Sequence, residues 1–380
     1  MIASIVILPL FGMVRFTLLH GLFFTAWMIV IAGGLIASGL HEYWPVSVRH
    51  MVISLYLALF SVVLAAFITL DPGKHLKIIW RGYMWGAIFA ASAGIIGYFD
   101  LIPGSYELFT KYERARGTFK DPNVFGPFLV PAFLYCLHSL LTHGLRRGVI
   151  DLALMGLFLF SILMCFSRGA WFMFIIASAS YVAIYFFAAP TNEQRFKTLL
   201  LSFAVLLSLC LVIAFAMQFE SVQELWEVRA SLSQNYDVGD SGRFAGHAKA
   251  AGIILENPLG IGALYFGYYY HHELPHNLYL SMFLTSGWVG GIVFLILMVT
   301  TLIFGFSILL KRTSWMHYHA IAFCSFFGLM LESYIIDSDH WRLLYILMGM
   351  IWGAYAALRI EEIHEDAEFK RRDLSSRSML

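Results

Sequence analysis

The sequence predicts an all-α, polytopic membrane protein, and the observations behind this prediction are its composition and the spacing of its apolar segments. Of its 380 residues, 60% are hydrophobic and only 13% are charged, against about 25% charged residues in a soluble globular protein. So few charges cannot cover a surface that faces water. The composition therefore excludes a soluble enzyme, a disordered chain and a nucleic-acid-binding protein with a basic face, while the net charge of +1 indicates no particular partner.

Apolar segments of membrane-spanning length recur along the whole chain. A helix needs about 20 apolar residues to cross about 30 Å of hydrocarbon. With the short apolar segment 1–14 included, we expect about 10–12 transmembrane helices. The segment 277–287 is also apolar, but glycines at its end separate it from the next span, which favours a re-entrant or interfacial helix. The expected spans are 17–39, 51–70, 82–99, 123–143, 149–166, 171–189, 198–217, 289–310, 318–337 and 340–358.

Basic residues indicate how these spans are oriented, because cytoplasmic loops carry an excess of lysine and arginine. The tail 359–380 is basic, so we place it in the cytoplasm, after a single transmembrane domain over residues 1–358. Counting back across alternate spans, the other segments on that side are also short and basic. The opposite, outer face then holds the segments 40–50, 100–122, 167–170, 218–276 and 338–340.

Two arginines on this outer face depart from the usual distribution of basic residues. Arg168 lies between two apolar segments with only Ser167 and Gly169 as polar or small neighbours. Its side chain either extends to phospholipid head groups or belongs to an anion site, since guanidinium grips phosphate in a bidentate fork. Arg243 opens a predicted amphipathic helix that Asp240 or Ser241 is expected to cap. There it is a second candidate anion ligand, helped by the positive helix N-terminus.

The same predicted helix carries an apolar stripe, and His247 shares a face with Arg243. The stripe has i, i+4, i+7, i+11 spacing, which is typical of a helix lying on a bilayer surface. It consists of Phe244, Ala248, Ala251 and Leu255.

The histidines that follow invite a metal interpretation, which the pattern does not favour. His271, His272 and His276 lie close together, but Pro275 opposes helical pairing of His272 with His276, and no HExxH pattern is present. We therefore expect no metal ligands here. His276 stands just before an apolar helix, where a histidine can take a proton from a hydroxyl nucleophile.

Other polar residues leave structural and functional interpretations open. Arg116 and Lys120 extend the positive charge of the outer face, and Asp121 begins an Asp-Pro-Asn turn that also suits a helix cap. Glu332 and His138 lie inside predicted spans, where an ionisable group is costly unless it is paired or faces a cavity. The four cysteines lie in apolar segments without CxxC spacing, which indicates buried or lipid-facing thiols rather than disulfides or metal ligands.

Taken in order, these stretches resemble the O-antigen ligase and O-antigen polymerase family, bacterial membrane glycosyltransferases that use undecaprenyl-pyrophosphate-linked glycans. Each stretch is degenerate alone, but five in this order on one predicted face are fairly specific for the family, though not for the acceptor. The resemblance covers about residues 116–300. The matching stretches are Arg116–Gly126, Ser167–Trp171, Ser241–Arg243, Asn257–Gly262 and Pro275–Leu280.

The resemblance implies a GT-C-like fold in a bacterial inner membrane, with the outer loop 218–276 carrying part of a periplasmic active site. It implies inverting transfer without metal or other cofactor. Arg168 and Arg243 would hold the donor pyrophosphate, with Arg116 as a weaker candidate for donor contacts, and His276 would activate the acceptor hydroxyl. If His276 is not the base, the next candidates are His247, His272 and Asp121.

Several functions remain open at the level of sequence. The acceptor is a lipid A core sugar for a ligase, another lipid-linked repeat for a polymerase, or a Ser or Thr hydroxyl for a protein O-oligosaccharyltransferase. The last ranks lowest, because no large soluble domain is predicted. A transporter or flippase of lipid-linked glycans is the rival class, but such a protein should place polar groups near the bilayer midplane. Here they gather on one outer face, which favours the enzyme.

Overall fold

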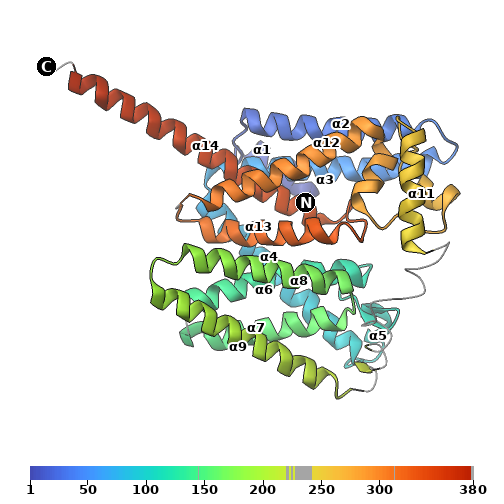
Figure 1. Ribbon diagram of the computed structural model, residues 1–380, viewed down its shortest axis with the longest axis horizontal. Helices are drawn as coiled ribbons and strands as arrows, with labels where there is room; N and C mark the ends of the chain where they lie inside the picture. Colours follow the sequence, from blue (N-terminus) through green and yellow to red (C-terminus); the bar gives the residue numbers. More distant parts are fainter. Residues whose placement is uncertain (144, 220–221, 224–225, 227–241, 312, 378–380) are drawn as a thin grey trace.

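The computed structural model describes the chain except for residues 144, 220–221, 224–225, 227–241, 312 and 378–380. Long helices run side by side along one axis, α11 lies across one end, and the last part of α14 extends beyond the other end (Figure 1). We call these the α11 end and the opposite end. The helices are α1 (Ile2–Leu10), α2 (Leu18–Ser38), α3 (Trp44–Leu70), α4 (Pro72–Tyr98), α5 (Ser105–Phe109), α6 (Pro122–His143), α7 (Leu145–Met164), α8 (Arg168–Ala188), α9 (Asn192–Ala216), α11 (Arg243–Glu256), α12 (Leu278–Leu309), α13 (Met316–Glu332) and α14 (Arg342–Arg377).

Helices make up most of the described chain, and many are long and apolar enough to cross a membrane, which confirms the all-α polytopic class. Among the described residues, seven helices are long and apolar enough to cross a membrane: α2, α3, α6, α8, α9, α12 and α14. The remaining long helices, α4, α7 and α13, run in the same bundle (Figure 1). The little extended structure consists of β1 (Thr110–Lys111) and β2 (Arg114–Ala115), an antiparallel pair between α5 and α6.

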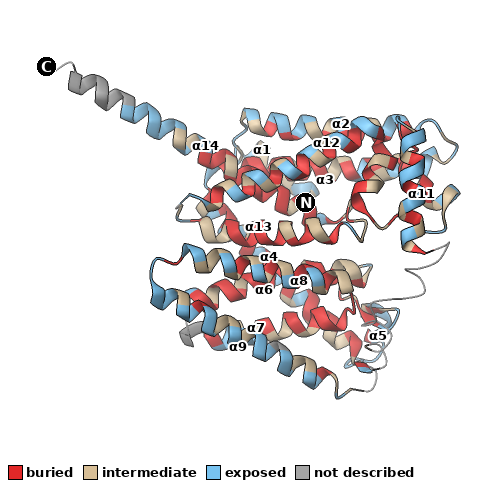
Figure 2. Ribbon diagram, viewed as in Figure 1, coloured by how far each residue is buried: buried red, intermediate tan, exposed pale blue. Residues whose placement is uncertain are grey.

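Burial follows the position of each helix in the bundle (Figure 2). The apolar windows of α6 and α14 are each 78% buried, whereas that of α9 is only 6% buried. Phe203 on α9 and Val289 on α12 are among many large apolar side chains that are exposed on the outside. An apolar exterior of this kind suits a surface covered by lipid rather than water.

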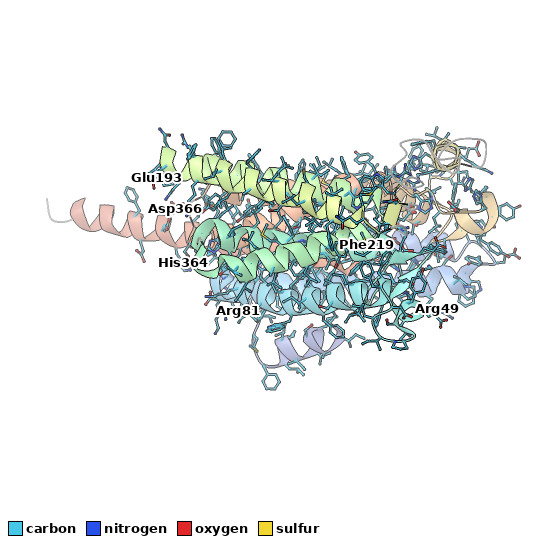
Figure 3. All side chains as sticks on the ribbon, turned by 90° about the horizontal axis from the view of Figure 1, so that it is seen from below. Arg49, Arg81, Glu193, Phe219, His364 and Asp366 are labelled. Carbon is cyan, nitrogen blue, oxygen red and sulfur yellow. The ribbon has the colours of Figure 1, made fainter. Side chains whose placement is uncertain are left out.

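Residues from the expected outer segments and residues from the expected cytoplasmic segments lie at opposite ends of the bundle, as the alternation of basic loops predicts. Arg49 and Phe219 lie toward the α11 end, whereas Arg81, Glu193 and the start of the charged tail lie toward the opposite end (Figure 3). Arg49 and Phe219, which belong to the expected outer segments 40–50 and 218–276, therefore lie toward the same end of the molecule.

The structure confirms the expected break between residues 277–287 and the next span. The label α12 covers Leu278–Leu309, but Gly287 has the non-helical angles φ 69° and ψ −171°, so two helical segments meet there at a kink. The loop 257–262 docks at the kink, where Trp288 N–H donates to Pro258 O at 2.8 Å and Ile261 N–H donates to Leu284 O at 2.7 Å. A Cβ on Gly287 would lie 2.5 Å from Pro258 O, so only glycine fits there.

The expected span 318–337 is shorter in the structure. α13 ends at Glu332, and residues 333–341 form a loop that leads into α14. The loop packs against the start of α12, because Leu278 N–H donates to Ser333 O at 2.9 Å. This early ending places Asp337 and Trp341 at the α11 end rather than in a membrane span.

Candidate functional site

A cavity of about 590 Å³ opens at the α11 end between segments that are far apart in the sequence. Its lining mixes charged groups with a set of large apolar side chains, a composition that suits a ligand with a charged and an apolar part. The polar lining residues are Arg114, Asp121, Asn123, Ser167, Arg168, Arg243, His276 and Asp337. The apolar ones are Val124, Phe166, Phe172, Phe244, Leu274, Ile335, Ile336 and Trp341.

Several helices have their first residues at or next to this cavity. α8 and α11 start with the lining residues Arg168 and Arg243, and α6 starts next to Asp121. α12 and α14 start just after His276 and Trp341. A helix N-terminus carries unpaired N–H groups and a partial positive charge. Their convergence gives the cavity a field that favours an anion, in addition to the charges of its arginines.

Arg168 is the first residue of α8, and its position is fixed by the cap that precedes it. The Ser167 side chain accepts a hydrogen bond from Ala170 N–H at 3.3 Å. The next residue must be small, because a Cβ on Gly169 would lie 2.6 Å from the Glu332 carboxyl. Glu332 is fully buried against this first turn, and among the described residues neither of its carboxyl oxygens has a hydrogen-bond partner. Glu332 is not one of the residues that line the cavity.

Arg243 is the first residue of α11 and is half-buried. Gly242 is the N-cap of α11, and the expected cap residues Asp240 and Ser241 lie outside the described part of the chain. One face of α11, with Gly246 and Ala250, is buried. The opposite stripe of Phe244, Ala248, Ala251 and Leu255 is exposed, as expected for a helix that presents an apolar face to a bilayer.

A third arginine, which the sequence patterns did not single out, also lines the cavity. Arg114 in β2 is buried, with Nε donating to Cys165 O at 2.7 Å and Nη2 donating to Asn123 Oδ1 at 2.8 Å. Arg116, the neighbour that was expected to contact the donor, is not among the lining residues. Its Nη2 donates instead to Leu108 O at 3.0 Å. Within the described residues, Arg114 rather than Arg116 is therefore the arginine of this stretch that reaches the cavity.

Asp121 lines the cavity and also organises the start of α6. Its Oδ1 accepts from Asn123 N–H at 2.8 Å, and its Oδ2 lies 3.9 Å from Nζ of Lys111. The turn and cap interpretation of this residue is therefore confirmed.

His276 lies in the lining with an unusual backbone conformation, held by a carboxylate. Its φ is 51°, in the left-handed region, which costs a non-glycine residue about 1–3 kcal/mol. Its N–H donates to Asp337 Oδ2 at 2.8 Å, and Asn277 N–H donates to Asp337 Oδ1 at 3.2 Å. Ser281 Oγ also donates to Asp337 Oδ1. The loop before α14 thus fixes the segment that carries the histidine.

The His276 ring lies near two carboxylates. Its Nδ1 is 3.8 Å from Asp337 Oδ2, and its Nε2 is 3.3 Å from Glu273 Oε2. Burial raises the pKa of the Asp337 carboxyl, while the hydrogen bond from Ser281 opposes that shift. A negative carboxylate next to the ring stabilises the imidazolium that forms when histidine takes a proton. Sequence reasoning missed Asp337 as a site residue, because nothing local to the Asp337–His340 segment shows that it meets residue 276.

The two secondary histidines lie outside the cavity lining. His247 is one turn along α11 from Arg243, next to the backbone of Pro275 and His276, and burial lowers the pKa of His247. His272 lies against the His271 ring, with centroids 4.3 Å apart. His138, the other polar residue left open, contacts the Tyr181 hydroxyl through Nδ1 at 2.8 Å and stacks on His317, which is a structural role away from the cavity.

Metal-ligating side chains gather elsewhere in the described part of the chain. His50, Asp339 and His340 have ligand atoms within 4.8 Å of one another. None of these three residues lines the 590 Å³ cavity. The 590 Å³ cavity itself brings together the cationic side chains of Arg114, Arg168 and Arg243.

Comparison with known proteins identifies a family to which part of this chain is similar. Residues 153–295 match the family model described as O-Antigen ligase, a segment that includes Arg168, Arg243 and His276. Arg114, Asp121 and Asp337 come from outside the matched segment and meet it only in the folded chain. A search of curated proteins found no match. The match over residues 153–295, on a polytopic all-α fold, supports a relationship of this chain to the O-antigen ligase and polymerase family.

Proposed function

We propose that the protein transfers a glycan from an undecaprenyl-pyrophosphate donor to an acceptor hydroxyl in the cavity at the α11 end. The observation that carries this proposal is that Arg168, Arg243 and His276 line one cavity together with a third arginine, Arg114. The family match supports membrane glycan transfer in general. In this proposal the α11 end faces the periplasm of a bacterial inner membrane, opposite to the basic tail.

The arginines bind the donor pyrophosphate. Arg168 and Arg243 begin α8 and α11, so side-chain charge and helix N-terminus act on the same anion. Removing one preorganised donor from such a site typically costs about 10²–10³ in rate. The apolar lining, with Phe172, Phe244 and Trp341, offers a surface to the isoprenoid chain.

The reaction itself needs one bond made and one broken. The acceptor oxygen attacks the anomeric carbon on the side opposite the pyrophosphate, so the configuration inverts. The bond from the anomeric carbon to the pyrophosphate oxygen breaks, and its electron pair stays on the pyrophosphate. His276 takes the acceptor proton and releases it to water, since its side chain is about one-third exposed (34%). No protein nucleophile is required, because pyrophosphate is already a good leaving group.

The proposal includes transfer that does not depend on a divalent metal at the reaction centre. The arginines supply the positive charge that a metal would otherwise bring to a pyrophosphate. Enzyme treated exhaustively with a chelator should therefore still transfer glycan. Loss of activity that one metal restores would contradict this part of the proposal. The exception is a metal requirement that comes from the His50, Asp339 and His340 group outside the cavity. In that case a variant lacking this group should be active without metal.

A reconstitution assay tests the proposal. The purified protein in nanodiscs is given a labelled lipid-linked oligosaccharide with lipid A core, a second lipid-linked repeat, or an acceptor peptide. We expect transfer to one of the sugar acceptors, and the acceptor used distinguishes a ligase from a polymerase. His276→Ala should bind donor but not transfer, because the variant lacks the proposed base.

Other outcomes of this assay would contradict the proposal. Movement of the intact lipid-linked glycan across the bilayer without transfer would identify a flippase. Transfer by His276→Ala at the wild-type rate would exclude this base and direct attention to His247, His272 or Asp121. Cysteines introduced at positions 237 and 376 should be labelled from opposite sides of the membrane, and labelling from the same side would overturn the assigned orientation.

A further inference from the structure

A second polar cluster lies at the α11 end, outside the cavity and without a role in the proposed reaction. His50 on α3 meets Asp339 and His340, which lie in the loop before α14. The Nε2 of His50 is 2.6 Å from Asp339 Oδ2. The rings of His50 and His340 stack with centroids 3.6 Å apart. Two segments nearly 290 residues apart thus bring two imidazoles and a carboxylate together.

We propose that His50, Asp339 and His340 form a binding site for a divalent transition-metal cation, with Zn²⁺ as the best match. Two imidazoles and one carboxylate are a donor set that Zn²⁺ accepts in tetrahedral sites, with bonds of about 2.0–2.2 Å. Such bonds place neighbouring ligand atoms about 3.3–3.5 Å apart. The ligand atoms here all lie within 4.8 Å of one another, so the widest pair needs to close by about 1.5 Å or less to meet that spacing. The His50–Asp339 pair, at 2.6 Å, needs to open, and the stacked imidazole rings need to turn so that a nitrogen of each points at the cation.

The surroundings of the cluster provide room and supporting contacts. His50 and Asp339 line a small cavity of about 20 Å³ together with Ser281, which is space for about one water as a fourth ligand. The hydroxyl of Ser54 lies 3.0 Å from Nε2 of His340. Zinc-bound histidines commonly make such a contact with the nitrogen that does not bind metal, and here it leaves Nδ1 for the cation. The His50 and Asp339 side chains are only 14% and 16% exposed, so water competes weakly.

The site would act as a cross-link rather than as part of the reaction. It joins α3 to the loop 333–341, and that loop holds Asp337, whose carboxylate bonds to His276 N–H. A cation bound to the native state alone stabilises that state by mass action. Metal binding should therefore raise the thermal stability of the protein, and the proposal does not depend on the identity of the catalysed reaction.

Metal-binding measurements on the full-length protein in nanodiscs test this site. After removal of metal with a chelator and dialysis, Zn²⁺ is titrated by calorimetry, and bound metal is counted by elemental analysis. We expect one tightly bound Zn²⁺ per chain and a rise in melting temperature on Zn²⁺ addition. Co²⁺ in its place should give the intense visible absorption of a tetrahedral site.

Variants separate this site from other histidines. His340→Ala and Asp339→Asn should bind Zn²⁺ at least about 100-fold more weakly, since they remove a direct ligand. Asp339→Asn keeps an oxygen for the contact with His50, so it tests the site even if His340→Ala does not fold. The matched control is the His271→Ala, His272→Ala double variant, which should bind Zn²⁺ like the wild type. No tight Zn²⁺ binding by the wild type, equal binding by the cluster variants, or loss in the control would each overturn the proposal and leave a His–Asp ion pair.

Discussion

Replacing Asp337 by asparagine tests whether this carboxylate positions the proposed base. In the wild type its two oxygens accept the N–H groups of His276 and Asn277, at 2.8 and 3.2 Å. Asparagine has the same shape but only one acceptor oxygen, so its amide group must face one of the two N–H donors. The substitution therefore removes at least one hydrogen bond to a charged acceptor, a loss of about 1.5–3 kcal/mol.

This loss of hydrogen-bond energy is comparable with the conformational strain of the His276 backbone, which the contact with Asp337 offsets. Keeping the left-handed φ of 51° costs His276 about 1–3 kcal/mol. Without the full set of hydrogen bonds, the backbone relaxes and the ring leaves its position for part of the time. A loss of 1.5–3 kcal/mol corresponds to about 10–150-fold in rate. We expect kcat to fall by this factor, while the affinity for the donor stays unchanged because the arginines lie on other elements.

Single-turnover transfer and donor binding, measured separately on Asp337→Asn, distinguish the two effects. The control is Asp71→Asn at the opposite end, where the Asp71 carboxylate accepts Lys74 N–H at 2.9 Å as the cap of α4. Asparagine caps a helix as well as aspartate does, so this variant should keep its rate and its melting temperature. A folded Asp337→Asn protein with a kcat within about twofold of wild type, or one that loses only donor affinity, would refute the positioning role.

Three further predictions follow from the same geometry. Arg168→Lys and Arg243→Lys should each lower donor binding or turnover, because a point charge does not reproduce the bidentate fork; full activity of both variants would return these arginines to a role as head-group anchors. Gly287→Ala should lower the free energy of unfolding by about 2–4 kcal/mol, because it combines a strained backbone with a main-chain clash. Gly82→Ala, with nothing within 4 Å of its Cβ, should be neutral in the same denaturation measurement. Burial lowers the pKa of His247 in the folded protein, so the unfolded chain binds that proton more readily and stability should fall as the pH drops through about 6.5. His247→Gln should flatten this part of the melting-temperature profile, and an unchanged slope would show that other groups cause it.

The sequence by itself determined the fold class and most of the arrangement of polar segments by end. Membrane spans are local properties, because each segment must satisfy its own backbone hydrogen bonds in lipid and show enough apolar side chains. The helix over 243–256 was equally readable, since its apolar stripe and the glycine and proline around it are local signals. For the same reason Arg168, Arg243 and His276 stood out, as polar residues at the outer ends of apolar segments.

Tertiary structure decided what those local signals leave open. Which of Arg114 and Arg116 lines the cavity depends on how β2 packs against Cys165, about 50 residues away in the sequence. The role of Asp337 depends on α13 ending at Glu332, so that the following loop reaches the start of α12. The geometry of the kink at Gly287 likewise depends on the loop 257–262, which supplies hydrogen-bond partners there. A sequence pattern reports the preference of one segment, whereas these contacts arise only when segments that are distant in the chain pack together.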